Sequence, residues 1–239
     1  MTGIKLMMLG GGVGQEDPGS VTYSAGSSGA IYEPSGWDTV DLEIAASCGQ
    51  TNKQNGAGFS PTGKGSMITK DGVAPADVTI YVASGRTVPG SSPGGTGGNA
   101  GVTNHTWSDG GYGGAASVAD VSGTASVAAG GGGDSGGGSI NVSRQGRPEN
   151  YGYHYCYDPS WIPTTPNGGN GAGAAYAGYY GGGGGGGGGV LGGAGCYPNI
   201  GGDPGGGQIG TPNTDGSINY TTVTHGDNAG AAYIIVSWG

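Results

Sequence analysis

The sequence predicts a mainly β and irregular fold, in which short β-strands hold a bundle of polyglycine II helices and no significant α-helix occurs. Glycine fills 63 of the 239 positions, and residues 181–189 are all glycine. A chain this rich in glycine is either disordered or ordered through backbone contacts that only glycine permits. Its glycines come in runs and not at every third position, which excludes collagen. Polyglycine II helices, with three residues per turn and lateral backbone contacts, are the remaining ordered solution.

The rest of the composition favours an ordered domain over a flexible linker. Charged residues make up 10% of the chain and the net charge is −9, which is modest beside that of disordered tails. The apolar residues are chiefly Val, Ile, Ala and Tyr, which suit strands. We therefore expect one glycine-rich domain over residues 1–239, with a strand-rich part at 1–90, a glycine lattice with aromatic loops at 91–230 and a closing strand at 231–239.

Three segments have the pattern of strands. In residues 39–46 apolar side chains alternate with Asp41 and Glu43, so we expect one buried face and one polar face. Residues 78–83 alternate in the same way. Residues 231–238 (AAYIIVSW) form the strongest strand candidate, and they are too apolar for an exposed edge, so we expect this strand to be buried.

The apolar runs and the charge indicate where the protein is made and which partners it does not bind. The apolar run near the N-terminus covers only residues 6–9, which is too short for a signal peptide or a membrane span. We expect a protein made in the cytosol, with no membrane insertion. Only 7 Lys and Arg residues oppose 16 Asp and Glu, which argues against nucleic acid as a partner.

The three cysteines do not form a disulfide framework, because their number is odd and the chain is long. Cys156 and Cys196 lie on either side of the longest glycine run and either pair with each other or remain thiols. Cys48 is then a third thiol, and three buried thiols are the simpler interpretation.

Four segments follow one another in an order known from phage adhesins: VDLEIAASCG (40–49), KGSMITKDGVAPADVTIYVASG (64–85), the polyglycine run and GAAYIIVSWG (230–239). The chain resembles the glycine-rich receptor-binding domains of phage tail-fibre adhesins. It is also similar to the distal adhesins of T-even-type phages, in which polyglycine helices form a sandwich and the intervening loops contact the host surface. The resemblance implies a virion protein of the tail fibre, assembled in the host cytoplasm, whose partners are a host cell-surface receptor (protein or glycan) and other fibre subunits.

Motifs of known enzymes occur only in fragments. Residues 133–137 spell GDSGG, the sequence around the nucleophile of chymotrypsin-like proteases, but His105 lacks the surroundings of the base that this mechanism needs. The GGGVG at 10–14 is followed by no helix, which argues against a nucleotide-binding turn. Asp134 and Asp203 lack the nonapeptide spacing of calcium repeats, and the histidines are not spaced as zinc ligands. We expect no enzymatic activity and no cofactor.

Aromatic residues concentrate in residues 149–166 (ENYGYHYCYDPSWIPTTP), with smaller groups on either side. These rings either pack on the glycine lattice or form a recognition surface, since Tyr and Trp are the preferred anchors of binding interfaces. The candidate receptor-binding residues are Tyr151, Tyr153, His154, Tyr155, Tyr157, Trp161, Tyr176, Tyr179, Tyr180, Trp107 and Tyr112.

Two other functions fit the composition less well. A virion decoration protein, or another structural glycine-rich surface protein, would share the lattice without host binding. An ice-binding or other surface-binding protein would need regular three-residue repeats with a flat Thr and Ala face, and the sequence lacks such repeats.

Overall fold

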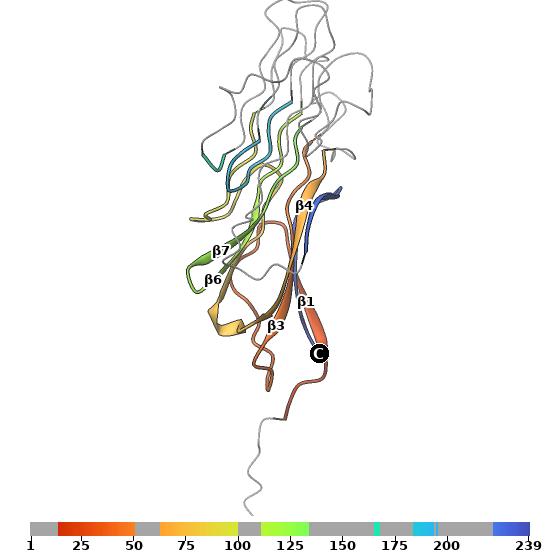
Figure 1. Cartoon of the computed structure of the whole chain (residues 1–239), viewed down its shortest axis with the longest axis vertical. Helices are drawn as coiled ribbons and strands as arrows, with labels where there is room; N and C mark the ends of the chain where they lie inside the picture. The colour runs from red at the N-terminus through yellow and green to blue at the C-terminus, as the bar shows by residue number, and fades with distance from the viewer. Residues whose placement is uncertain are drawn as a thin grey trace, which may run out of the picture.

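The computed structural model describes residues 14–50, 63–99, 111–133, 165–167, 184–193, 195 and 222–239. Within these residues the protein is mainly β, with two antiparallel sheets and a single short 3-10 turn, η2 (Pro75–Asp77) (Figure 1). The prediction of a β protein without significant α-helix is therefore confirmed for the described part of the chain.

The larger sheet has five strands, and the C-terminal strand lies inside it. Its order is β1 (Gly19–Ser24), β9 (Tyr233–Trp238), β3 (Val40–Ala45), β4 (Gly65–Val73) and β8 (Thr222–Asn228). Ile234 of β9 lies opposite Tyr23 of β1 on one side and Ile44 of β3 on the other. The prediction that the C-terminal strand is not an edge is confirmed.

The smaller sheet has four strands, in the order β2 (Ser28–Ala30), β5 (Val78–Tyr81), β6 (Ser117–Val121) and β7 (Thr124–Ala128). Strands β6 and β7 are joined by Ser122 and Gly123, whose φ angles of 51° and 85° are both positive, as in a type I′ hairpin turn. These two strands, together with β8, lie within residues 91–230, where the sequence predicts only lattice and loops.

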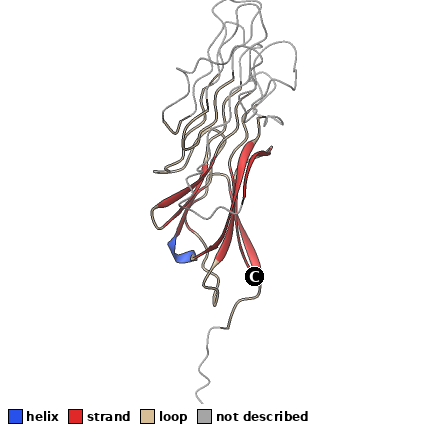
Figure 2. Ribbon diagram, in the orientation of Figure 1, coloured by secondary structure: helices blue, strands red, loops and turns tan. Residues whose placement is uncertain are grey.

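The two sheets face each other across one apolar core (Figure 2). In β3 the side chains of Val40, Leu42 and Ile44 are buried while Asp41 is exposed, which confirms the predicted alternation. The core also contains the following buried residues from the other strands and their ends: Ile31, Ile68, Val73, Val78, Ile80, Val82, Ala115, Ala119, Ala128, Ala232, Ile234, Val236 and Trp238. Each fully buried Val, Leu or Ile side chain contributes about 1.5–3 kcal/mol, so this core stabilises the sandwich.

At one end of the sandwich the two sheets come together. Residues 46–50 continue β3 and residues 111–116 lead into β6, and the amide of Ser47 donates to the carbonyl oxygen of Ala115 at 3.3 Å. Packed sheets normally lie about 10 Å apart because side chains separate them. Ser47 and Ala115 are small and fully buried, so their backbones can approach and bond directly.

Candidate functional site

The amides of residues 46–50 donate in rotation to three neighbouring segments. The amides of residues 46 and 49 donate to carbonyl oxygens in segment 63–66, and those of residues 47 and 50 donate to segment 112–115. The amide of residue 48 donates to Gly230. The bonds are Ala46 to Ser66 at 3.1 Å, Ser47 to Ala115 at 3.3 Å, Cys48 to Gly230 at 3.2 Å, Gly49 to Gly63 at 2.7 Å and Gln50 to Tyr112 at 2.8 Å. In a β-strand, direction alternates with a period of two. Here the first two neighbours each recur after three residues.

The same period of three relates the other glycine segments to each other. Three pairs of amides, each three residues apart, donate to one segment per pair: residues 113 and 116 to segment 95–98, residues 130 and 133 to segment 184–188, and residues 185 and 188 to segment 111–116. The bonds are Gly113 to Gly98 and Ala116 to Gly95, both at 3.0 Å, Gly130 to Gly188 at 2.7 Å and Gly133 to Gly185 at 2.8 Å, and Gly185 to Gly111 at 3.0 Å and Gly188 to Gly114 at 2.9 Å. We call the body formed by residues 46–50, 63–66, 95–98, 111–116, 129–133 and 184–188 the glycine lattice. It extends from the sandwich on the side away from the C-terminus (Figure 1).

The glycine lattice is packed so closely that side chains are excluded from most of its glycines. A Cβ added to Gly113 would overlap the carbonyl oxygen of Gly186, and a Cβ on Gly187 would overlap that of Gly130. Glycines 49, 95, 97, 114, 130, 131, 133, 185 and 188 meet a neighbouring carbonyl oxygen in the same way. Glycine is therefore required here because another backbone occupies the place of its side chain.

Four of the segments that lie between described residues begin and end at or beside the glycine lattice. Residues 165–167 bond to it through Asn167, whose Oδ1 accepts from the amide and the hydroxyl of Thr96, both at 3.0 Å. The carbonyl oxygen of Pro166 also accepts from Gly189 at 2.9 Å. The gaps at 51–62, 100–110, 134–164 and 168–183 are therefore each flanked by residues that belong to the lattice, adjoin it or bond to it.

The predicted receptor-binding residues fall almost entirely in these gaps. Tyr112 is the only one of them that the structure describes. The other ten lie outside the described residues: Trp107, Tyr151, Tyr153, His154, Tyr155, Tyr157, Trp161, Tyr176, Tyr179 and Tyr180. Cys156 and Cys196 also lie outside the described residues, whereas Cys48 is described and its side chain is buried.

Tyr112 lies on the lattice segment 111–116 and forms a cation–π contact. The guanidinium carbon of Arg86 lies 4.6 Å from the centre of the Tyr112 ring. Both side chains are half-buried. Gln50, which donates its amide to Tyr112, carries its side-chain nitrogen near Gly85, 3.4 Å from where a Cβ on that glycine would lie. Arg86, Tyr112 and Gln50 thus come from three segments to one place, a group that we call the Arg86 cluster.

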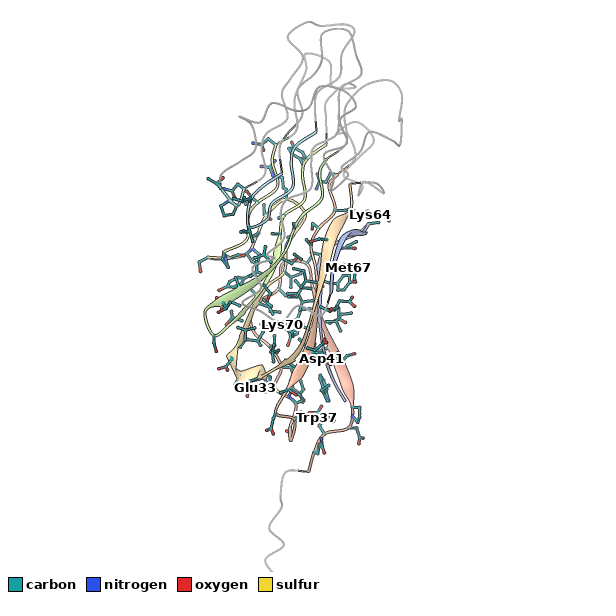
Figure 3. All side chains as sticks on the ribbon, in the orientation of Figure 1. Glu33, Trp37, Asp41, Lys64, Met67 and Lys70 are labelled. Atoms are coloured by element: carbon teal, nitrogen blue, oxygen red, sulfur yellow. The ribbon has the colours of Figure 1, made fainter. Side chains whose placement is uncertain are left out.

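A second group of aromatic side chains surrounds Glu16 at the other end of the sandwich. The Glu16 carboxylate accepts from the Tyr32 hydroxyl at 2.9 Å and from the Ser35 amide at 3.1 Å, and its backbone carbonyl accepts from the Trp37 indole at 2.8 Å. The Tyr32 and Trp238 rings lie 5.6 Å apart. Figure 3 places Trp37 at the end away from Lys64, the charged residue of the lattice. The sequence does not reveal this group, because its contacts join residues far apart in the chain.

Hydrogen bonding and burial shift the pKa of three described side chains. The hydrogen bond to Glu16 raises the pKa of Tyr32. Burial, with a 2.7 Å hydrogen bond to Glu43, raises the pKa of Tyr233 to about 12. Burial lowers the pKa of Lys70, which lies on β4 opposite Leu42 of β3. None of these groups belongs to a metal site, because no three His, Cys, Asp or Glu side chains gather as ligands in the part of the chain that the structure describes.

No family model matches the sequence, and no curated protein matches it. No helix among the described residues is long and apolar enough to cross a membrane.

Proposed function

We propose that this protein is a non-enzymatic receptor-binding adhesin at the tip of a phage tail fibre, and that its glycine segments are polyglycine II helices that support recognition loops. The observation that carries the proposal is the rotation of the amides of residues 46–50 among three neighbours. A polyglycine II helix has three residues per turn, so its amides return to the same neighbour after three residues, as the amides of residues 46 and 49 and those of residues 47 and 50 do.

The positions of the aromatic residues along the chain support a recognition role. Trp107 belongs to the connection between residues 99 and 111, the cluster from Tyr151 to Trp161 to that between 133 and 165, and Tyr176, Tyr179 and Tyr180 to that between 167 and 184. All three connections start and finish at the lattice. Residues on loops that a rigid scaffold supports can vary without disturbing the fold, which suits a surface that must match different receptors.

The partners in this proposal are a host cell-surface receptor, either a protein or a glycan, and the other subunits of the fibre. Tyr and Trp suit both kinds of receptor, because their rings give a large and rigid contact area at low entropic cost. The net charge of −9 suits neither nucleic acid nor insertion into an anionic membrane. Assembly in the host cytoplasm follows from the proposed place in the virion.

A triple variant tests the recognition role. Changing Tyr153, Tyr155 and Trp161 together to Ala should reduce binding to host cells by several orders of magnitude, since each hot-spot aromatic residue contributes about 2 kcal/mol or more. The control changes Tyr32, an exposed aromatic residue at the other end of the sandwich, to Phe and should leave host binding unchanged. Normal host binding by a folded triple variant would contradict the proposed site, and unfolding of that variant would make these rings part of the scaffold.

Labelling of virions tests the proposed location. An antibody to this chain should bind the tips of the tail fibres in electron micrographs. Label on the head would indicate a decoration protein instead, and the absence of label from intact virions would exclude both roles.

A further inference from the structure

Backbone hydrogen bonds hold the three segments of the Arg86 cluster in place. Arg86 lies in a tight turn in which Ser84 and Thr87 exchange backbone hydrogen bonds at 2.8 and 3.0 Å. Gly85, the first residue of the turn, has a φ of 58°, which a residue with a side chain rarely adopts. The Arg86 carbonyl oxygen also accepts from Gly97 at 2.8 Å. The position of Arg86 is therefore fixed by the turn and by the lattice together.

Tyr112 and Gln50 are fixed to the same degree. The Tyr112 carbonyl oxygen accepts from the Gln50 amide at 2.8 Å, and the amide of the next residue, Gly113, donates to Gly98 at 3.0 Å. Both side chains thus project from lattice segments whose backbones cannot shift independently. A site whose supporting backbone is rigid loses little entropy when a ligand binds.

The chemistry of the cluster suits a ligand that carries both an anionic group and hydroxyls. The guanidinium group lies over the Tyr112 ring at 4.6 Å, and the donors at the edge of a stacked guanidinium can still form a two-pronged bond to a carboxylate or a phosphate. The lattice segments contain no Asp or Glu that would compete for the guanidinium. The Gln50 carboxamide supplies both a donor and an acceptor for hydroxyl groups.

We propose that Arg86, Tyr112 and Gln50 form a binding site for an anionic sugar, which carries a carboxylate or a phosphate group. The carboxylate or phosphate bonds the edge of the Arg86 guanidinium, which the Tyr112 ring holds in place from below, and Gln50 bonds a hydroxyl of the sugar. This inference deepens the proposed adhesin role and rests on it, since it gives that role one class of ligand.

An NMR titration of the full-length chain tests the site with glucuronate, glucose 6-phosphate and glucose as probes. We expect glucuronate or glucose 6-phosphate to bind at least about tenfold more tightly than glucose, and the better of the two identifies the anionic group. Arg86→Gln should remove this preference. Arg86→Lys keeps the charge but not the planar fork, so it should weaken binding by a smaller factor. Lys64→Gln makes the same change of charge elsewhere on the lattice and should leave binding unchanged.

Equal binding of all three probes, or no binding of any, would overturn the site, as would an unchanged preference in folded Arg86→Gln. If Arg86→Gln does not fold, Arg86→Lys decides, and full affinity in that variant contradicts the two-pronged bond. Host-cell binding is measured in parallel. A chain that binds host cells but no anionic sugar refutes this site alone, and one that binds the sugar but no host cell refutes the adhesin role alone.

Discussion

Ser66 and Ala129 exchange two hydrogen bonds across the boundary between the two sheets. The Ser66 amide donates to the Ala129 carbonyl oxygen at 2.8 Å, and the Ala129 amide donates to the Ser66 hydroxyl oxygen at 2.6 Å. Ser66 belongs to β4 of the larger sheet, and Ala129 directly follows β7 of the smaller one. Both residues are fully buried, so neither backbone group has water as an alternative partner.

Ser66→Ala should therefore destabilise the protein by about 1–3 kcal/mol, because it leaves the Ala129 amide buried without a partner. Ser47→Ala is the matched control. Ser47 is equally buried, but its hydroxyl has no hydrogen-bond partner among the described residues, so its removal should be neutral or stabilising. Denaturant unfolding of both variants measures the difference. Equal losses of stability would show that the Ser66 hydroxyl does not satisfy the amide.

The glycine lattice makes a second prediction, which compares Gly187→Ala with Gly230→Ala. A Cβ on Gly187 meets a backbone carbonyl that cannot move alone, so this change should cost about 3 kcal/mol or more. A Cβ on Gly230 meets nothing nearer than Asn228 Oδ1 at 3.6 Å, an ordinary contact, so this change should leave the free energy of unfolding nearly unchanged. Melting temperatures test both variants. An unchanged melting temperature for Gly187→Ala would contradict the close packing of the lattice.

The third prediction concerns β9, which lies between β1 and β3. Ile234 is fully buried in the core, so Ile234→Ala should cost about 2–5 kcal/mol. Ile235 points to the other face and is only half-buried, so Ile235→Ala should cost less. Removal of residues 233–239 should give insoluble protein, because β1 would lose its pairing with the rest of the sheet and one edge of β3 would be left open. A soluble and folded truncated chain would show that the strand is peripheral.

Burial of Tyr233 and its hydrogen bond to Glu43 raise the pKa of this tyrosine and make stability depend on pH at the alkaline end. The pKa of Tyr233 is about 12 in the folded protein, above the value of about 10 expected for a tyrosine in the unfolded chain. The folded state therefore keeps this proton longer. The stability that it contributes is complete below about pH 10 and is lost as the pH rises through about 12.

Comparison with Tyr233→Phe isolates this contribution from that of the other tyrosines. The wild type should be the more stable of the two by about 1 kcal/mol at pH 8, and the difference should disappear by about pH 12. Glu43→Gln keeps an acceptor without the charge and should lower the pH at which the difference is lost. A difference that stays constant between pH 8 and 12 would mean that the Tyr233 proton plays no part.

Alternation of apolar residues predicted three strands of the sandwich well. The alternating side chains of Val40, Leu42 and Ile44 lie in the core as expected, and β5 and β9 lie within the ranges predicted for them. Strands β6 (SVADV) and β7 (TASVA) were not predicted, because their residues are small and glycine runs adjoin them. Small residues suffice there, since the facing backbones already lie close.

The segments that join the glycine lattice were harder to predict than the strands of the sandwich. Residues 46–50 (ASCGQ) contain a single glycine and looked like the end of a strand, yet they donate to three neighbours. A position in the lattice needs glycine only where another backbone occupies the place of the Cβ, as at Gly49. Where that place is free, Ala, Ser or Gln fits equally well, so glycine content alone underestimates the lattice.

The rotation of hydrogen bonds among three neighbours has a mechanical consequence. A β-sheet resists stretching along its strands and across its hydrogen bonds, but it bends readily about an axis in its own plane. The segments from residue 46 to residue 188 are cross-linked in several directions around each chain, so no single plane of weakness separates them. A load applied from the side would be shared by bonds to several neighbours, so the resistance of such a body to bending should depend little on the side from which the load comes.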